Sequence, residues 1–561
     1  MNFKKKTILL LPLLLTMLFS CNGQNNNNSS SLDSQTEVDS CASEPIYHGE
    51  DIEVSKIISN EYGRNIEVEG KDFIYLGTQI RVDAFMNCDK YTYADIKYLF
   101  KEAAALGVNC IQVPVEWSKI EFAQDEFNFK YVHEMLSYAN EYDLKVEIMW
   151  YGSNMCGDTH SYSVPNYILA DGRTYPKFDA LRTGEFWNYY GILWYLDFDH
   201  PNLVSRETNA VRKLMDYIYT FDSTHGGKKP VIGVQIENEP DAFPRWRIDQ
   251  YEVKSPTTGA KMTMEEGFEK VCNSVDALGK EVKNAKYKVY TRVNFANATN
   301  GSVYTGSIVN DAPSYVKKVN NLEGIDIVGD DCYMSSVRNV KGIINMFNSL
   351  PNNFGHIAEN AGNYQNTPSL ILAALAQHGG YSIYDLMTSP FFIQNGSGDV
   401  NQGIIDPGET ANTFVYKNHY EETKLLISGL KMVESEIYKL DKDNVFAFNV
   451  TSDYPSKSKN QSISSKHSTI EFTTSQTALG FGLDFGSYID LFLTHDASIK
   501  LSNGTITEVH TGSLLDDVFT SSGSVTFNNN TVNISGGQVY RITYTSSGPI
   551  ESTTCANIGV S

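Results

Sequence analysis

Hydrophobic and polar positions along residues 70–440 follow two alternating patterns. Short runs that are almost entirely apolar recur, and segments with apolar residues at every third or fourth position lie between them. The first pattern is typical of strands buried on both faces of a parallel sheet, and the second of helices that cover such a sheet. Eight runs are predicted to be strands: 75–82, 108–114, 144–150, 231–236, 288–293, 324–328, 355–358 and 381–384.

Helices are predicted at the amphipathic segments between these strands. The first, 93–106, has apolar residues three and four positions apart and is followed by Gly107, a residue that commonly ends a helix. The others are 131–142, 209–221, 265–283, 340–348, 369–378 and 414–439. This alternation predicts an α/β fold, a (β/α)8 TIM barrel over residues 46–440, with its reactive groups at the carboxyl ends of the strands.

The pattern changes beyond residue 441. Ser, Thr, Asn and Gly dominate, and apolar residues alternate with polar ones in short segments, which indicates antiparallel strands. Three such segments are 524–527, 531–534 and 540–544. We therefore expect residues 441–561 to form a β-sandwich, an accessory domain with a structural or glycan-positioning role.

The first residues resemble an export signal. Lysines at positions 4–6 precede the apolar run 8–19, which is too short to span a membrane in the mature protein. Leu18-Phe19-Ser20-Cys21 resembles a bacterial lipobox, so residues 1–20 are expected to be cleaved and Cys21 to be lipidated; an ordinary signal peptide is the alternative. The polar residues 21–45 are expected to be a tether. These features predict a lipid-anchored location at the cell envelope, in the outer membrane, with its periplasmic or surface face left open.

The charge balance excludes some partners. There are 45 Lys and Arg against 67 Asp and Glu, a formal net charge of −22. Such a chain repels phosphate backbones and anionic lipid headgroups, so neither nucleic acid nor a polybasic membrane contact is expected. Aromatic residues make up 12 %, which suits either a packed core or surfaces that stack on sugar rings.

The cysteines and histidines give no sign of a cofactor. The chain has no CxxC, HExxH or phosphate-binding loop, so neither a metal nor another cofactor is expected. The run 399–406 has the start of a calcium loop but lacks its Gly and final Glu, and is expected to be a turn. A disulfide between Cys41 and Cys555 is left open. The cysteines expected to be buried thiols are Cys88, Cys110, Cys156, Cys272 and Cys332.

Two glutamates lie where predicted strands end. Glu239 closely follows the strand 231–236, and Glu359 follows the strand 355–358. Carboxylates from opposite strands of a barrel face each other across its mouth, and glycosidic bond cleavage requires such a pair. A buried ion pair is the alternative for Glu359.

Four blocks in chain order resemble one family of clan A glycoside hydrolases. The run Gln-Ile-Glu-Asn-Glu at 235–239 is similar to the acid/base strand of the β-galactosidase family, which reads "QVENE". Residues 113–129 resemble the second-strand block of that family, residues 144–167 its third-strand block, and residues 326–333 its sixth-strand block. The resemblance extends over residues 70–440 and implies a retaining glycosidase that acts by double displacement.

The same resemblance implies the residues of the site. Glu239 would be the general acid/base, with Asn238 on the 2-hydroxyl of the sugar. Glu359 would be the nucleophile, and Tyr333 would hydrogen-bond it or serve as a core residue. Glu237, two residues before Glu239, is interpreted as a buried support on the same strand face.

Further candidates for contact with the sugar lie near other strand ends. Trp117, Trp150 and Tyr151 are expected either to face the sugar or to pack in the core. Arg81 is expected either to hold a sugar hydroxyl or to form an ion pair.

Three functions remain open at the level of the sequence. The first is a retaining, exo-acting, β-galactosidase-like hydrolase of plant or host oligo- or polysaccharides. The second is an endo-acting β-mannanase or β-glucanase on the same barrel, and the third is a non-catalytic glycan-binding lipoprotein. The long segments 151–200 and 390–412 favour a closed pocket, and with it the exo-acting enzyme.

Overall fold

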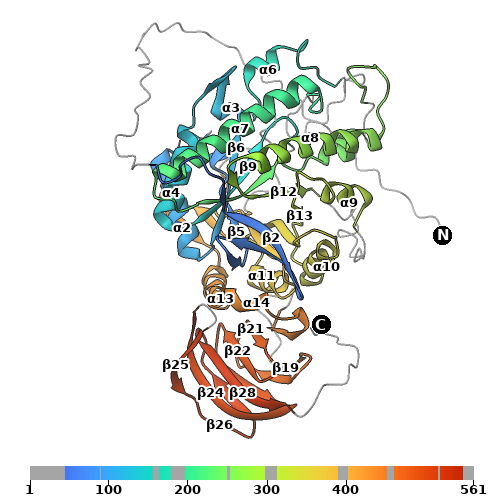
Figure 1. The fold of residues 1–561 in the computed structure, drawn as a ribbon. Coiled ribbons are helices and arrows are strands. Elements are labelled where there is room, and N and C mark those ends of the chain that lie inside the picture. Colours follow the sequence, from blue (N-terminus) through green and yellow to red (C-terminus); the bar gives the residue numbers. More distant parts are fainter. Residues whose placement is uncertain are drawn as a thin grey trace, which may run out of the picture. The chain divides into compact units, whose positions relative to one another are not determined.

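The centre of the fold is a closed barrel of eight parallel strands (Figure 1). The computed structural model describes residues 45–546 except 87, 89, 156–162, 179–195, 249–252, 297–311, 390–401, 451–459 and 516–517. The strands, in their order around the barrel, are β10 (Val231–Ile236), β12 (Tyr290–Phe295), β13 (Ile327–Asp331), β14 (His356–Ala361), β15 (Gly380–Tyr384), β5 (Leu76–Gln79), β6 (Cys110–Glu116) and β9 (Lys145–Tyr151). The predicted TIM barrel is confirmed.

The strands are buried because helices cover the outside of the barrel and side chains fill its inside. Every residue of β10 is buried, which explains its nearly continuous apolar sequence. Gly233 in this strand has no room for a side chain, because a Cβ there would collide with the ring of Tyr290 on β12. The glycine therefore lets a large tyrosine lie inside the barrel.

The helices around the barrel largely match the predicted segments. Helix α2 begins at a capping box made by Thr92 and Asp95, and ends at Gly107 with a φ of 96°. The principal helices are α2 (Tyr93–Leu106), α4 (Lys130–Tyr142), α7 (Pro201–Thr224), α8 (Met264–Asn284), α10 (Val337–Asn348), α11 (Thr367–Leu375) and α13 (Tyr420–Met432).

The prediction of one helix over 414–439 is wrong. Residues Phe414–Tyr416 form strand β17, because they hydrogen-bond in antiparallel register to β16 (Ile405–Pro407). Helix α13 then ends at Met432, and a separate short helix, α14 (Glu434–Ile437), follows it.

A small antiparallel sheet, absent from the predictions, precedes the barrel. It consists of β2 (Ser55–Asn60), β3 (Gly63–Val68) and β4 (Lys71–Phe73). Ser55 connects it to the amino ends of two barrel strands: its hydroxyl donates to the carbonyl of Ile232 and accepts from Tyr290 N at 3.1 Å. The sheet therefore lies at the end of the barrel opposite the predicted site.

The last part of the described chain is a β-sandwich, as predicted. One sheet has the order β18-β21-β22-β28-β24-β25 and the other β19-β20-β23-β27-β26, and apolar side chains of both sheets share one core. Their bounds are β18 Val445–Phe448, β19 Asn460–Ser464, β20 Thr469–Thr473, β21 Gly480–Asp484, β22 Tyr488–Leu493, β23 Ala497–Leu501, β24 Gly504–Leu515, β25 Val518–Ser524, β26 Phe527–Asn528, β27 Thr531–Ile534 and β28 Val539–Ser546. The predicted strand 524–527 is wrong, because β25 ends at Ser524 and β26 begins at Phe527.

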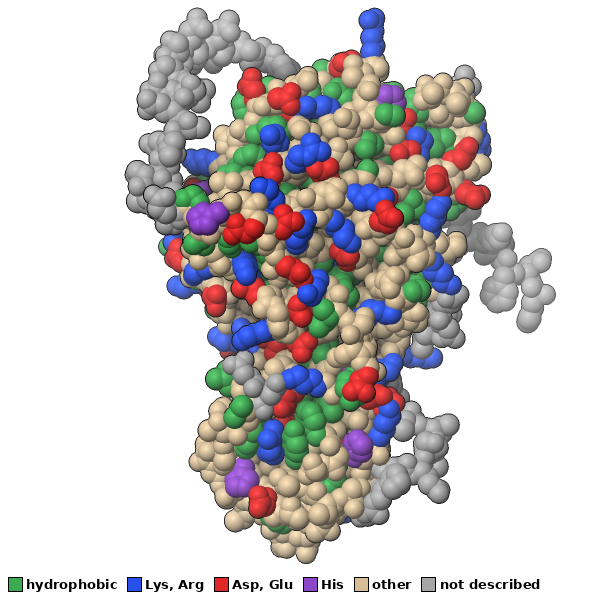
Figure 2. Space-filling view, in the orientation of Figure 1, with side chains coloured by type: hydrophobic (Ala, Val, Ile, Leu, Met, Phe, Trp, Pro, Cys, Tyr) green, Lys and Arg blue, Asp and Glu red, His purple; other side chains and the backbone are tan. Residues whose placement is uncertain are grey.

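Charged side chains are distributed unevenly over these parts. On the face seen in Figure 2, acidic and basic side chains are interspersed over the barrel, and few charged side chains lie on the sandwich. Within the described ranges, no helix combines the length and apolar character that crossing a membrane requires.

Several predictions fall on residues outside the described ranges. These are the cleaved segment 1–20, the lipidated Cys21, all but the last residue of the tether 21–45, and the thiols Cys41, Cys156 and Cys555. Among the described cysteines, Cys110, Cys272 and Cys332 are buried as predicted. Cys88 is only partly buried, because it lies in the turn that follows the short helix α1 (Val82–Met86).

Candidate active site at the carboxyl end of the barrel

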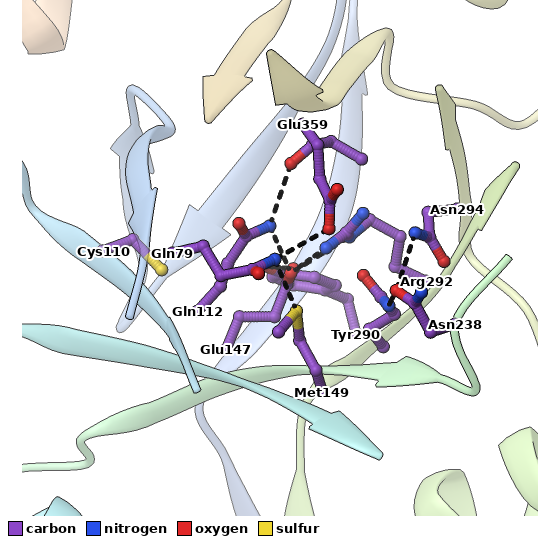
Figure 3. A network of polar contacts seen from close by, with 12 residues as sticks. Gln79, Cys110, Gln112, Glu147, Met149, Asn238, Tyr290, Arg292, Asn294 and Glu359 are labelled. Atoms are coloured by element: carbon purple, nitrogen blue, oxygen red, sulfur yellow. Dashed lines mark hydrogen bonds and ion pairs between the residues drawn. The ribbon is translucent and has the colours of Figure 1, made fainter. Parts of the chain in front are cut away.

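Glu359 lies near the carboxyl end of β14 with both carboxylate oxygens hydrogen-bonded. Gln79 Nε2, from β5, donates to Oε1 at 2.7 Å (Figure 3), and Tyr333 Oη donates to Oε2. The side chain is 5 % exposed, and burial raises the pKa of this carboxyl. The two hydrogen bonds and the charges of Arg81 and Arg292 oppose that rise, because they favour the ionised form.

Tyr333 reaches Glu359 from the segment that follows β13. Its backbone has a positive φ of 38°, which is uncommon for a large residue and here directs the chain out of the strand. Tyr364 Oη donates to the carbonyl of Tyr333 at 2.8 Å, and the ring of Tyr384 contacts the ring of Tyr333 edge-on. The contact between Tyr333 and Glu359 is therefore built into the fold, and the catalytic role of Glu359 stays a prediction.

Glu239 is held near the end of β10 through its backbone. Its N–H donates to Asn294 Oδ1 at 3.0 Å, and its φ is 45°. Asn294 Nδ2, on β12, also donates to Asn238 Oδ1 at 3.1 Å, a contact visible in Figure 3. Asn294 thus fixes both predicted residues of the Asn-Glu pair, although the sequence analysis did not select it.

Asp331 is a third carboxyl group of this site that the sequence analysis missed. It is the last residue of β13 and lies opposite Glu359 in the register of β13 and β14. Its Oδ2 accepts from Asn294 Nδ2 at 2.7 Å, whereas no described residue hydrogen-bonds its Oδ1. Burial, followed by the charges of Glu359 and Glu239, raises the pKa of Asp331. Asp331 is therefore close enough to both predicted catalytic groups to interact with their charges.

Glu237 is buried as predicted, but for a different reason. Strand β10 ends at Ile236, and Glu237 lies in the following turn with a φ of 60°. Its carboxylate accepts hydrogen bonds from the backbone N–H groups of Gly152 and Asn154, each at 3.0 Å. The prediction that strand alternation places it below Glu239 is wrong, because the strand has already ended.

The predicted aromatic contacts to sugar are core residues. Trp117 and Trp150 are both 0 % exposed, and their indole N–H groups donate to Glu121 at 2.6 Å and Glu207 at 2.9 Å. Tyr151 is 2 % exposed and packs with two methionines. This burial supports the core alternative, and contact of these rings with a sugar stays a prediction.

Arg81 forms the ion pair that the sequence left as an alternative. Its Nε and Nη2 donate to the two oxygens of Asp83 at 3.0 and 2.8 Å, and its Nη1 donates to Tyr384 Oη at 3.1 Å. The guanidinium lies 5 % exposed near the mouth of the barrel. Its charge contributes to the site, and its nitrogen atoms are largely committed to protein partners.

A different polar layer lies below the mouth, inside the barrel. Glu147 on β9 accepts from Arg292 Nε at 3.0 Å, from Gln112 Nε2 at 3.2 Å and from Tyr290 Oη at 2.7 Å. Figure 3 shows this layer beneath Glu359. Both charged side chains are 0 % exposed, so a buried ion pair supports the floor of the site, although Arg292 Nη1 has no hydrogen-bond partner among the described residues.

The chemistry of the mouth is that of carboxyl and amide groups. Over the described parts of the chain, no group of three or more His, Cys, Asp or Glu is arranged to hold a metal ion. Glu239, Asp331 and Glu359 come from three strand ends, and Asn294 lies between Asp331 and the backbone of Glu239. Such an arrangement can transfer protons and attack an electrophilic carbon.

Sequence comparison matches one region of the chain to a family. Residues 270–455 match the profile of a family described as a domain of unknown function, DUF4978. No curated protein sequence matches at a significant level. The matched region includes β13 and β14, and therefore both Asp331 and Glu359.

Solved structures with a similar fold include several glycosidases. The exo-β-1,4-mannosidase Op5Man5 from Opitutaceae bacterium strain TAV5 is 12 % identical with a TM-score of 0.44, over 68 % of this chain and 63 % of that one. A β-galactosidase from the psychrophilic Marinomonas ef1 is 12 % identical with a TM-score of 0.42, over 66 % of this chain and 61 % of that one. A family 39 glycoside hydrolase from Bacteroides cellulosilyticus WH2 is 10 % identical with a TM-score of 0.39, over 86 % of this chain and 84 % of that one.

These similarities are distant. This chain matches less than two thirds of the length of the mannosidase and of the β-galactosidase. At such identities and TM-scores they carry no argument about substrate or about individual residues.

Proposed function

We propose that this protein is a retaining glycoside hydrolase, with Glu359 as the nucleophile and Glu239 as the general acid/base. The observation that carries the proposal is the setting of Glu359. Each of its oxygens accepts one hydrogen bond, from Gln79 and from Tyr333, so the carboxylate is fixed in orientation, and both bonds counteract the rise in its pKa that burial causes. A nucleophilic carboxylate needs a fixed orientation and its charged form.

The proposed reaction is a double displacement. Glu359 attacks the anomeric carbon while Glu239 protonates the leaving oxygen, and a covalent glycosyl ester forms. Glu239 then removes a proton from water, which attacks the same carbon and releases Glu359. Asn294 supports Glu239 by accepting a hydrogen bond from its backbone N–H.

The substrate is proposed to be a β-galactoside or a related β-glycoside, cleaved from the end of a chain. The resemblance of the strand Gln235–Glu239 to the β-galactosidase family supports this choice. An endo-acting β-mannanase or β-glucanase is the second candidate. Nitrophenyl monoglycosides and soluble β-mannan or β-glucan distinguish the two, because an endo-acting enzyme degrades the polymers and leaves the monoglycosides intact.

Two variants test the roles of the glutamates. Glu359→Gly should be inactive, and azide should restore activity and yield a glycosyl azide of opposite anomeric configuration. Glu239→Ala should lose activity on natural glycans and retain part of it on aryl glycosides, whose leaving group needs no proton. Glu126→Ala, at an exposed glutamate, is the control. Wild-type rates in both site variants would refute the assignment.

We also propose that the protein is anchored to the cell envelope by a lipid on Cys21. The lipobox-like run at 18–21 supports this. Expression with a radiolabelled fatty acid should label the wild type and leave Cys21→Ala unlabelled; equal labelling would contradict the proposal.

A further inference from the structure

Asp385 is a buried carboxyl group at the candidate site that the proposed reaction does not use. It directly follows Tyr384, the last residue of β15, and is 1 % exposed. Neither of its carboxyl oxygens has a hydrogen-bond partner among the described residues. A buried acceptor without a donor is unfavourable, and a ligand with hydrogen-bond donors in the candidate site would satisfy it.

The backbone holds Asp385 beside the residues that bind Glu359. Leu386 N donates to the carbonyl of Gln79 at 2.9 Å, and Ile404 N donates to the carbonyl of Asp385 at 3.1 Å. Strand β15 pairs with β14 through Tyr384 and Ala361, two residues after Glu359. Burial raises the pKa of Asp385; the nearby charge of Arg81 lowers it, and those of Glu359 and Asp406 raise it. The backbone thus places Asp385 next to the strands that carry Gln79 and Glu359, close enough for the charge of Glu359 to act on it.

Arg81, whose charge acts on Asp385, is already engaged. Arg81 makes two hydrogen bonds to Asp83, and Arg292 is bound to Glu147 in the layer below. Acidic groups thus outnumber the cations that could compensate them in the mouth, which contains Glu239, Asp331, Glu359 and Asp385. A ligand that satisfies Asp385 must bring hydrogen-bond donors, and a second negative charge on it would be repelled.

We propose that Asp385 binds hydroxyl groups of the sugar that occupies the site of Glu359, and that this site selects neutral glycosides over uronides and sulfated sugars. The inference rests on the proposed function for its reaction. The two oxygens of one carboxyl group can accept from two neighbouring hydroxyls of a pyranose ring. Asp385 is therefore a specificity-determining residue, and it takes no part in the proton transfers.

The test measures kcat/KM on aryl glycosides. Asp385→Asn should lose about 10- to 150-fold on the preferred neutral glycoside for each hydroxyl bound, the range for a hydrogen bond to a charged group. For the wild type, a deoxy substrate that lacks the contacted hydroxyl should show a similar loss of kcat/KM. On that deoxy substrate, kcat/KM of Asp385→Asn should be little lower than that of the wild type. Asp406→Asn is the matched control, because Asp406 is paired with Lys417.

The outcomes separate this inference from the proposed function. Normal rates in Asp385→Asn, or uronides cleaved as fast as the neutral glycosides, would overturn the inference and leave the glycosidase intact. If the wild type cleaves no glycoside, the proposed function fails. Saturation-transfer NMR with neutral monosaccharides and the corresponding uronic acids then decides the inference: it expects binding of the neutral sugars alone, lost in Asp385→Asn. Any other binding pattern would overturn it.

Discussion

The mouth of the barrel and the polar layer below it bury carboxyl groups in opposite ways. In the lower layer Glu147 accepts hydrogen bonds from Arg292, Gln112 and Tyr290, so its charge is compensated. In the mouth, Oδ1 of Asp331 and both oxygens of Asp385 have no partner among the described residues. Both layers are excluded from solvent, so burial alone does not account for the difference.

The contrast separates Glu147, whose hydrogen bonds stabilise the fold, from Asp331 and Asp385, whose oxygens have unused hydrogen-bonding capacity. A buried carboxylate that is paired and hydrogen-bonded, as Glu147 is, is tolerated, whereas a buried carboxyl without donors destabilises the folded state. The pKa values of Asp331 and Asp385 are both raised by burial. The unpartnered acceptors of the mouth therefore lower stability, and the proposed ligand would satisfy them.

The largest expected effect comes from breaking the lower layer. Glu147→Leu leaves the guanidinium of Arg292 buried without its counter-charge, and should lower the free energy of unfolding by about 3–5 kcal/mol. Urea denaturation followed by circular dichroism measures this. Asp385→Asn, in the mouth, is the comparison and should not lower the value, because it removes a buried carboxyl that has no donor among the described residues. Similar losses in the two variants would remove the distinction between the layers.

The next effect is a dependence of stability on pH that originates in the mouth. The pKa values of Asp331 and Asp385 are higher in the folded state than the ordinary value of about 3.9. Their contribution to stability is therefore complete below about pH 4 and is lost as pH rises through the raised values. A rise of one in either pKa corresponds to about 1.4 kcal/mol of stability.

Removing both carboxyl charges should reduce this dependence. In the double variant Asp331→Asn, Asp385→Asn, urea midpoints should fall less between pH 4 and pH 8 than in the wild type. The amide oxygen that replaces Oδ2 of Asp331 can still accept from Asn294, so the frame around Glu239 is retained. Activity should nevertheless decrease, because a hydroxyl acceptor has been lost. Parallel stability curves for the double variant and the wild type would contradict the prediction.

The sequence predicts the barrel better than it predicts the mouth. β10 and α2 follow from local patterns, an apolar run and a capped amphipathic helix, and both occur at the predicted residues. Asp331 is visible in the sequence within an acidic pair at the end of a predicted strand. Its importance depends on the register that places it opposite Glu359, which no local pattern contains.

Other differences have the same origin. Trp117 and Trp150 are candidates for the sugar surface because they lie near strand ends, and their burial by neighbouring segments supports the core alternative. The sheet of β2, β3 and β4 was missed because its role depends on contacts with β10 and β12, far away in the sequence.

The smallest expected effect concerns the pair Glu237 and Glu207, whose carboxyl groups are hydrogen-bonded but also lie against each other. Glu237 accepts from two backbone N–H groups but also lies against Glu207, and burial and this neighbour raise its pKa. Its contribution to stability is present below about pH 4.3 and is lost as pH rises through the raised value. Glu207→Gln replaces the like charge with an amide that can donate to Glu237, and the hydroxyl of Ser153 can rotate to accept from the amide. We expect this variant to be more stable than the wild type by about 1 kcal/mol at pH 8 and equal to it near pH 4.

Glu121→Gln is the control, because it weakens the pair with Arg206 and should be less stable at both pH values. A loss of stability in Glu207→Gln at pH 8 would mean that the pair is held as an ordinary hydrogen-bonded support, and that only the mouth stores unfavourable charge.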